Sequence, residues 1–354
     1  MYKKVAIFPV NHETVALVRY AYIGKFEPIA LVAPELSILD GEDISKLDGG
    51  SPSNIILCSN YTQGIQNCEA VIFLGHTDEE VYKELMLVAK AHNREIWTPG
   101  FAQENIKREV TTLASDGDIS LANDLIPQKL LNIDTPIISI YGIGYNCGIL
   151  HTEFLARDFF MGNGYKVLQI GSVDYSQYLG CVAFPSFIFD SNLNYTEKAI
   201  KFNRFIFDLE KEQNPDVIII GTPNPIMKYS DDVLNGLGIV PFIIQNSIKS
   251  DIGIVNLYYS KYDFEYIEMI SQLTRFRFNI PFRYFGLSNV NAHKNQDMDG
   301  KMEYLHLETS FVKSNFNPEI GNDKYTIYPA YDKDSAYETF RKIEAELQSN
   351  VLRI

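Results

Sequence analysis

The chain has 354 residues, of which 46% are hydrophobic and 21% are charged. This composition excludes a disordered or fibrous protein, and the length suits two domains of about 150 residues each. The formal net charge of −14 repels phosphate backbones and anionic lipid, so we expect neither nucleic acid nor a membrane as the partner.

The first hundred residues alternate short apolar runs with amphipathic runs. Strands are predicted at 4–8, 28–33, 54–58, 70–74 and 94–98, and helices at 13–23 and 78–93. Apolar runs without alternation are typical of parallel strands buried on both faces. The βαβ rhythm predicts a small doubly wound α/β domain over 1–115, Rossmann-like or flavodoxin-like. No G-x-G-x-x-G follows the first strand, which argues against NAD or FAD.

A second α/β series follows a predicted linker at 116–134 and fills residues 135–354. Its predicted strands are 136–141, 165–170, 216–221, 239–244, 252–257, 282–286 and 303–307, and its predicted helices are 149–163, 196–213, 262–275 and 333–349. The pattern predicts a second doubly wound domain, of the P-loop-NTPase-like type with a degenerate phosphate loop.

The most informative segment joins the strand at 136–141 to the helix at 149–163 through the loop Gly142-Ile-Gly-Tyr-Asn-Cys-Gly148. A glycine-rich loop between a strand and a helix can direct backbone N–H groups and the helix N-terminus at a phosphate. The candidate phosphate-binding residues are Gly142, Gly144, Asn146, Cys147, Gly148 and Thr152.

This loop departs from the P-loop pattern G-x-x-x-x-G-K-[ST] at the position of the lysine. Five residues separate Gly142 from Gly148, and Ile149 stands where the lysine would be. The strand at 216–221 also ends in glycine, without an acid to hold Mg²⁺. Three interpretations stay open: a turn that needs glycine for backbone reasons, a ligand site without hydrolysis, and an NTPase that uses ATP and magnesium.

A second candidate site is the loop at 171–187, which follows a buried strand. Ligands of open α/β sheets bind at the carboxyl ends of the strands. Its candidate ligand-binding residues are Gln169, Ser172, Asp174 and Phe184. The alternative is a long surface loop whose aromatic residues pack inward.

The histidines and cysteines show no metal-site spacing. Two H-x-E pairs, at His151 and His306, lack the P-C-x-x-C of a zinc deaminase, so we expect no metal. Cys147, at a helix start, is either a thiol of lowered pKa or a packed side chain. The four cysteines lack C-x-x-C spacing and no apolar run spans a bilayer, which favours a reduced, cytoplasmic protein.

An arginine-rich aromatic segment runs from Arg275 to Phe285. It is interpreted as an edge strand with one polar face. Contact with a peptide carboxylate is the alternative. The net negative charge of the chain disfavours stacking on RNA.

The chain resembles a family of peptide maturation system proteins, which accompany radical SAM enzymes in gene clusters for ribosomally made peptide natural products. The resemblance rests on ordered blocks: Gly142-Ile-Gly-Tyr-Asn-Cys147, Gly164-Tyr-Lys-Val-Leu-Gln-Ile-Gly-Ser172, Asp174-Tyr175, Leu179-Gly180, Phe184-Pro-Ser-Phe187 and Pro215-Asp-Val-Ile-Ile-Ile-Gly221. The family's loop has a lysine where this chain reads Gly148-Ile149-Leu150. In its layout the chain is also similar to a more distant two-domain group that includes D-glutamate N-acetyltransferases.

The resemblance implies a cytoplasmic accessory protein in peptide maturation. Such a protein would bind a precursor peptide, a partner enzyme or a nucleotide-like ligand without fast hydrolysis. The alternative is an enzyme, an ATP-dependent ligase or an acyl transferase acting between the domains. Catalytic residues and homo-oligomerisation stay open.

Overall fold

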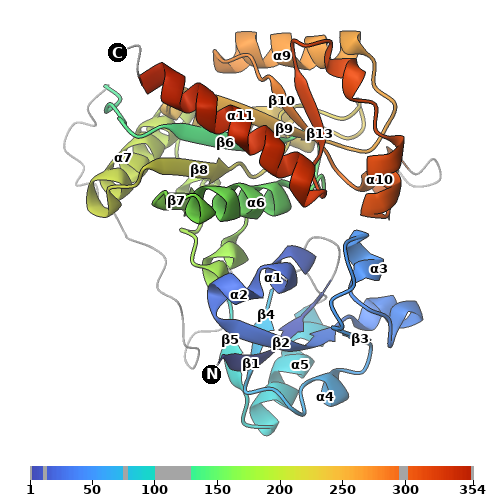
Figure 1. The fold of residues 1–354 in the computed structure, drawn as a ribbon. Coiled ribbons are helices and arrows are strands. Elements are labelled where there is room, and N and C mark those ends of the chain that lie inside the picture. Colours follow the sequence, from blue (N-terminus) through green and yellow to red (C-terminus); the bar gives the residue numbers. More distant parts are fainter. Residues whose placement is uncertain (1, 11–13, 75–78, 100–128, 295–301, 352–354) are drawn as a thin grey trace. The chain divides into compact units, whose positions relative to one another are not determined.

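The computed structural model describes residues 2–10, 14–74, 79–99, 129–294 and 302–351 (Figure 1). These residues form two compact units. One contains the described residues up to 99 together with Val173–Ala183, and the other contains residues from 129 to Ser172 and from Phe184 onward. The predicted linker at 116–134 lies mostly outside the described residues.

The N-terminal unit is built on a parallel five-stranded sheet with the order β3-β2-β1-β4-β5. Its strands are β1 (Lys3–Phe8), β2 (Phe26–Val32), β3 (Leu57–Cys58), β4 (Ala70–Phe73) and β5 (Glu95–Trp97). Its helices are α1 (Val15–Arg19), α2 (Ala21–Gly24), α3 (Ser45–Asp48), α4 (Tyr61–Gly64) and α5 (Glu79–Ala91). The order 3-2-1-4-5 is that of a Rossmann sheet and not of flavodoxin, so the predicted doubly wound fold is confirmed and made specific.

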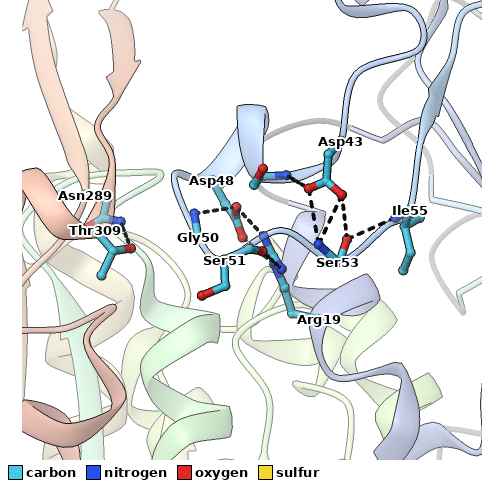
Figure 2. A network of polar contacts seen from close by, with 10 residues as sticks. Arg19, Asp43, Asp48, Gly50, Ser51, Ser53, Ile55, Asn289 and Thr309 are labelled. Atoms are coloured by element: carbon cyan, nitrogen blue, oxygen red, sulfur yellow. Dashed lines mark hydrogen bonds and ion pairs between the residues drawn. The ribbon is translucent and has the colours of Figure 1, made fainter.

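A polar network closes the loop between β2 and β3 in this unit. Arg19 donates from Nε to Asp48 Oδ2 and from a terminal nitrogen to Asp48 Oδ1, both at 2.8 Å (Figure 2). Asp43 accepts from the backbone amides of Ser45 and Ser53 at 2.8 and 3.1 Å. Two-pronged arginine–carboxylate pairs are the strongest of side-chain ion pairs. The network therefore fixes the connection between β2 and β3, which contains α3.

The C-terminal unit is built on a parallel six-stranded sheet with the order β13-β10-β9-β6-β8-β7. Its strands are β6 (Ile137–Gly142), β7 (Val167–Ile170), β8 (Val217–Gly221), β9 (Ile252–Leu257), β10 (Tyr284–Leu287) and β13 (Thr326–Pro329). An antiparallel hairpin joins β11 (Val290–Lys294) to β12 (Met302–His306). Strand order reverses between β6 and β9, which places the glycine-rich loop at the switch point.

Helices cover both faces of the six-stranded sheet. They are α6 (Ile149–Gly162), α7 (Tyr195–Gln213), α8 (Ile239–Ser247), α9 (Phe264–Phe278), α10 (Thr309–Asn315) and α11 (Lys333–Val351). Helices α6 and α11 pack together (Figure 1). Helix α8 contacts both α7 and α9. Local sequence explains the ends of the long helices: Asn194 and Glu197 form a capping box at α7, and Asp263 caps α9.

The structure corrects the predicted strand at 239–244, because these residues form helix α8. An apolar run of six residues cannot be assigned from periodicity alone. The helix begins after Gly238, and Pro241 sits in its first turn, where a backbone N–H is not needed. Both neighbouring helices contact α8, and the buried environment explains why it is apolar almost all round.

The predicted edge strand at 275–285 is also wrong. Arg275 and Arg277 lie in the last turn of α9, where the helix dipole favours cations. Asn279 ends the helix in the left-handed conformation. The strand β10 that follows lies between β9 and β13 and is buried throughout. The arginine and aromatic alternation therefore belongs to a helix end and a turn.

One segment leaves the C-terminal unit and packs in the N-terminal unit. It contains the 3-10 helix Asp174–Leu179, which contacts α1 and α2. Tyr178 is 6% exposed and stacks on Trp97, with ring centroids 5.9 Å apart. The predicted second domain, 135–354, included this segment because no sequence signal marks an excursion of eleven residues.

None of the helices in the described part of the chain combines the length and the apolar character that crossing a bilayer requires.

We expect Tyr178→Ala to lower the unfolding free energy by about 3 kcal/mol, because a buried aromatic side chain and its stacking on Trp97 are lost. Trp97 is the single tryptophan of the chain, so its fluorescence during urea unfolding reports on the N-terminal unit. Tyr195→Ala, at a side chain that is 58% exposed, is the control. An unchanged urea midpoint for Tyr178→Ala would contradict the packing role of the segment.

Candidate functional site

The glycine-rich loop has the strand-loop-helix geometry that the sequence predicts. Strand β6 ends at Gly142, and α6 begins at Ile149 directly after Gly148. Gly148 has φ = +78°, a conformation that other residues rarely adopt, and no side chain caps the helix. The first backbone N–H groups of α6 therefore lie at the carboxyl end of the sheet, where an anion is favoured.

The glycines of the loop are required by close contacts with the protein's own side chains. A Cβ at Gly142 would lie 2.4 Å from Cys147 Sγ and 2.9 Å from Ile149 Cδ1. One at Gly144 would lie 2.0 Å from the hydroxyl of Tyr258, and one at Gly148 would lie 2.8 Å from the ring of Tyr331. The inner side of the loop is thus packed with side chains, with Ile149 folded over Gly142.

Cys147 is a packed thiol and not a nucleophile. It is 1% exposed, and its Sγ donates to the carbonyl of Gly144 at 2.9 Å. Burial raises the pKa of this thiol to about 12, although backbone N–H groups of the loop act in the opposite direction. Of the two roles considered for Cys147, the structure supports packing.

Asn256 fastens the loop to the neighbouring strand β9, and sequence reasoning missed it. The side chain is fully buried, and its Nδ2 donates to the carbonyl of Cys147 at 3.1 Å and to Thr152 Oγ1 at 2.8 Å. Thr152 is 1% exposed, so it serves this anchor from inside the fold. The position of Asn256 at the carboxyl end of a predicted strand was the signal available.

Tyr258 and Asn146 complete the loop. The Tyr258 hydroxyl donates to the carbonyl of Tyr145 at 2.6 Å, and Asn224 Nδ2 donates to the Tyr145 hydroxyl at 3.2 Å. Asn146 is half-buried with φ = +59°, which asparagine tolerates better than most residues. The loop is therefore held from both β9 and the segment after β8.

A buried carboxylate lies at the end of β8, where the sequence predicted none. Glu153, on α6, is fully buried, and its Oε1 is 1.8 Å from the position of a Cβ on Gly221. Gln169 Nε2 donates to Glu153 Oε2 at 3.1 Å, and the backbone N–H of Ser172 donates to the carboxylate at 3.3 Å. Helix α6 thus supplies the acid that strand β8 lacks. The residues of the strand alone give no sign of it.

The second group of candidate residues is divided by the structure. Gln169 and Ser172 come together around Glu153 in the C-terminal unit. Asp174 begins the 3-10 helix that belongs to the N-terminal unit. Phe184 stacks on Phe202 in the C-terminal unit, with centroids 5.5 Å apart. The four residues therefore do not form one site within either unit.

The remaining candidates have structural surroundings. His151 stacks on Tyr331 with centroids 4.1 Å apart, next to the N-terminus of α6. The described residues contain no group of three His, Cys, Asp or Glu side chains that could hold a metal ion. The sequence also offers Gly75-His-Thr-Asp78, which follows the predicted strand at 70–74 and is a candidate to line the crevice of the N-terminal sheet, but this segment lies outside the described residues.

Glu153 makes stability depend on pH. Burial raises its pKa from 4.5 to about 7. Between these two pH values the unfolded chain has released the proton and the folded chain has kept it. The free energy of unfolding therefore falls as the pH rises from about 4.5 to about 7, and it stays at this lower level above pH 7. We expect Glu153→Gln to be more stable than the native chain by about 3 kcal/mol at pH 8 and by under about 1 kcal/mol at pH 5.

Urea unfolding followed by far-UV circular dichroism at both pH values measures this difference. Glu212→Gln, on the exposed side of α7, is the matched control and should give no pH-dependent difference. An equal difference at pH 5 and pH 8 for Glu153→Gln would show that Glu153 is ionised throughout.

Comparisons with known proteins support the fold. No family model and no curated protein matches the chain. A crystal structure of a DUF1611 family protein from Anabaena variabilis is similar, with a TM-score of 0.54 and 10% identity, covering 81% of this chain and 88% of that one. At this identity the likeness shows a shared α/β architecture and nothing of function.

Two further solved structures are similar at a level too low to carry an argument. Chloroplast FtsY from Physcomitrella patens has a TM-score of 0.28 and 14% identity, over 46% of this chain and 52% of that one. A pseudomurein peptide ligase type C from Methanothermus fervidus has a TM-score of 0.28 and 12% identity, over 84% and 52%. The predicted relation to peptide maturation proteins stays a prediction.

Proposed function

We propose that the C-terminal unit binds a phosphate-bearing, nucleotide-like ligand at the glycine-rich loop without hydrolysing it. The observation that carries this proposal is the uncapped N-terminus of α6, a helix of 14 residues, at the point where the strand order of the sheet reverses. Backbone N–H groups at such a terminus attract anions, and ligands of open α/β sheets bind at this end.

The side chains around the loop support a role without turnover. Ile149 supplies no charge opposite the phosphates, and its Cδ1 packs against Gly142. Glu153 is the carboxylate nearest to the end of β8, but Gln169 and Ser172 already bind it and it is fully buried. Phosphoryl transfer needs charge stabilisation and a metal held at the phosphates. Neither side chain is placed to provide these.

We also propose the pathway that the family resemblance implies, an accessory role in the maturation of a ribosomally made peptide. The support for it is the run of sequence blocks between Gly142 and Gly221. The partner would be the precursor peptide or a peptide-modifying enzyme. Isothermal titration of the protein with synthetic precursor peptides, with and without nucleotide, tests the first of these partners, and no binding in either condition would refute a direct role in binding the precursor peptide.

We expect ATP and ADP with Mg²⁺ to raise the melting temperature in a saturable way. A ligand at 100 times its Kd adds about 2.7 kcal/mol to the folded state. Asn146→Asp adds one negative charge to the loop at a residue that tolerates the left-handed conformation, and it should weaken nucleotide binding at least about tenfold. The measurement is isothermal titration with each nucleotide.

Asn214→Asp is the matched control, because Asn214 is exposed, has φ = +46° and ends α7. It should bind nucleotide as the native chain does. Absence of any melting shift with millimolar ATP, ADP or inorganic phosphate would refute the ligand site. Steady release of phosphate from ATP would refute a role without turnover.

We expect Ile149→Lys alone to leave phosphate release at the level of the blank. A lysine restores one charge, but the buried Glu153 remains bound by Gln169 and Ser172 and is not free for a metal. Magnesium-dependent phosphate release from this variant, measured with a coupled colorimetric assay, would show that a metal ligand exists.

A further inference from the structure

A cavity of about 740 Å³ opens in the C-terminal unit at the amino ends of β9 and β10. The C-terminal ends of α8 and α9 and the turn that follows α9 form its walls, and α11 contributes Glu346. Its size lies in the range of small-molecule sites, about 300–1,000 Å³. The turn belongs to the arginine and aromatic segment that the sequence singled out and that the glycine-rich loop does not use.

Gln245 presents a fixed hydrogen-bond donor to this cavity. The residue is 6% exposed, and its Oε1 accepts from the hydroxyl of Tyr141 at 2.7 Å and from that of Ser250 at 2.9 Å. These two bonds use the oxygen and so set the orientation of the amide. The amide nitrogen makes no hydrogen bond within the described part of the chain, although Gln245 lines the cavity.

Two cations line the same cavity. Arg283 pairs with Glu346, which also accepts from the hydroxyl of Tyr284 at 2.7 Å. Lys249 is exposed and forms no ion pair among the described residues. Asp251, the other acid of the wall, accepts from the backbone N–H of Ile137 at 2.9 Å. The charge of Lys249 opposes the rise that burial causes in the pKa of Asp251, but no carboxylate of the described residues holds Lys249 in an ion pair, so its ammonium group is available to a ligand.

We propose that this cavity binds a monocarboxylate with an apolar body, its carboxylate held by Lys249 and the Gln245 amide. Ile248, Ile252 and Ile280 provide apolar wall. A single negative charge matches the lysine that forms no ion pair among the described residues, whereas the nearby Asp251 and Glu346 would repel a phosphate dianion more strongly than a monocarboxylate. A free carboxylic acid and the carboxyl terminus of a peptide share this chemistry.

The cavity is separate from the glycine-rich loop. Strand β9 runs from Ile252 at the cavity to Asn256 and Leu257 beside the loop. At about 3.3 Å per residue, these ends lie roughly 15 Å apart along the strand. Binding at one end can thus be measured without reference to the other, and failure of either proposal leaves the other standing.

Isoleucine δ1-methyl NMR of the full chain tests the proposal. The probes are 3-phenylpropionate, N-acetyl-Gly-Gly-Phe with a free carboxylate, and N-acetyl-phenylalaninamide as the neutral analogue. We expect at least one acid to shift the methyl signals of Ile248, Ile252 and Ile280 and to leave Ile149 unchanged. The acid that binds more tightly identifies the source, a free acid or a peptide terminus.

Three lysine variants complete the experiment. Lys249→Met should lower the affinity for the more tightly bound acid at least about tenfold, which is the loss expected for one charge-assisted hydrogen bond. Lys249→Arg should keep the affinity for this acid within about threefold of the native value. Lys261 is an exposed lysine outside the cavity wall, and Lys261→Met should leave the affinity unchanged. The proposal is overturned if neither acid shifts these methyls at about 10 mM, if the amide binds equally well, or if Lys249→Met retains native affinity.

Discussion

Close packing of side chains onto glycine is the constraint on which the C-terminal unit depends. Cys147, Tyr258, Tyr331 and Glu153 each take the space that a Cβ would need, at Gly142, Gly144, Gly148 and Gly221 respectively. These contacts bring β6, α6, β8 and β9 together at the carboxyl end of the sheet. The same glycines that suggest a phosphate loop are therefore also what the fold requires, and only the uncapped start of α6 distinguishes a ligand site from a turn.

Much of the fold could be predicted because its strands are buried on both faces and read as unbroken apolar runs, as in β6 and β8. Helix α8 could not, because its apolar run is short and its surroundings decide its form. The loop was found from its glycines. Its anchor Asn256 was not, because the residue lies 114 positions from Gly142 and only the sheet order brings it to the loop. Glu153 was not found either, because it reaches the end of β8 from helix α6.

The two proposed sites lie at opposite ends of one parallel sheet. At the carboxyl end, helix N-termini and backbone N–H groups favour an anion, and binding there needs few charged side chains. At the amino end, the helix C-termini of α8 and α9 favour cations, so a carboxylate must be held by explicit donors such as Lys249 and Gln245. The contrast explains why the first site was visible as a motif and the second only as a cavity.

The path of the chain between the two units has a practical consequence. The chain passes from one unit to the other three times, because Val173–Ala183 leaves the C-terminal unit and returns to it. A gene fragment that ends before residue 173 lacks Tyr178, whose ring stacks on Trp97. A fragment that starts after the first unit carries the segment Val173–Ala183 without the unit in which it packs. The two halves are thus poor candidates for recombination as independent modules. Fragment complementation would need the segment Val173–Ala183 of the second fragment to bind to the first fragment.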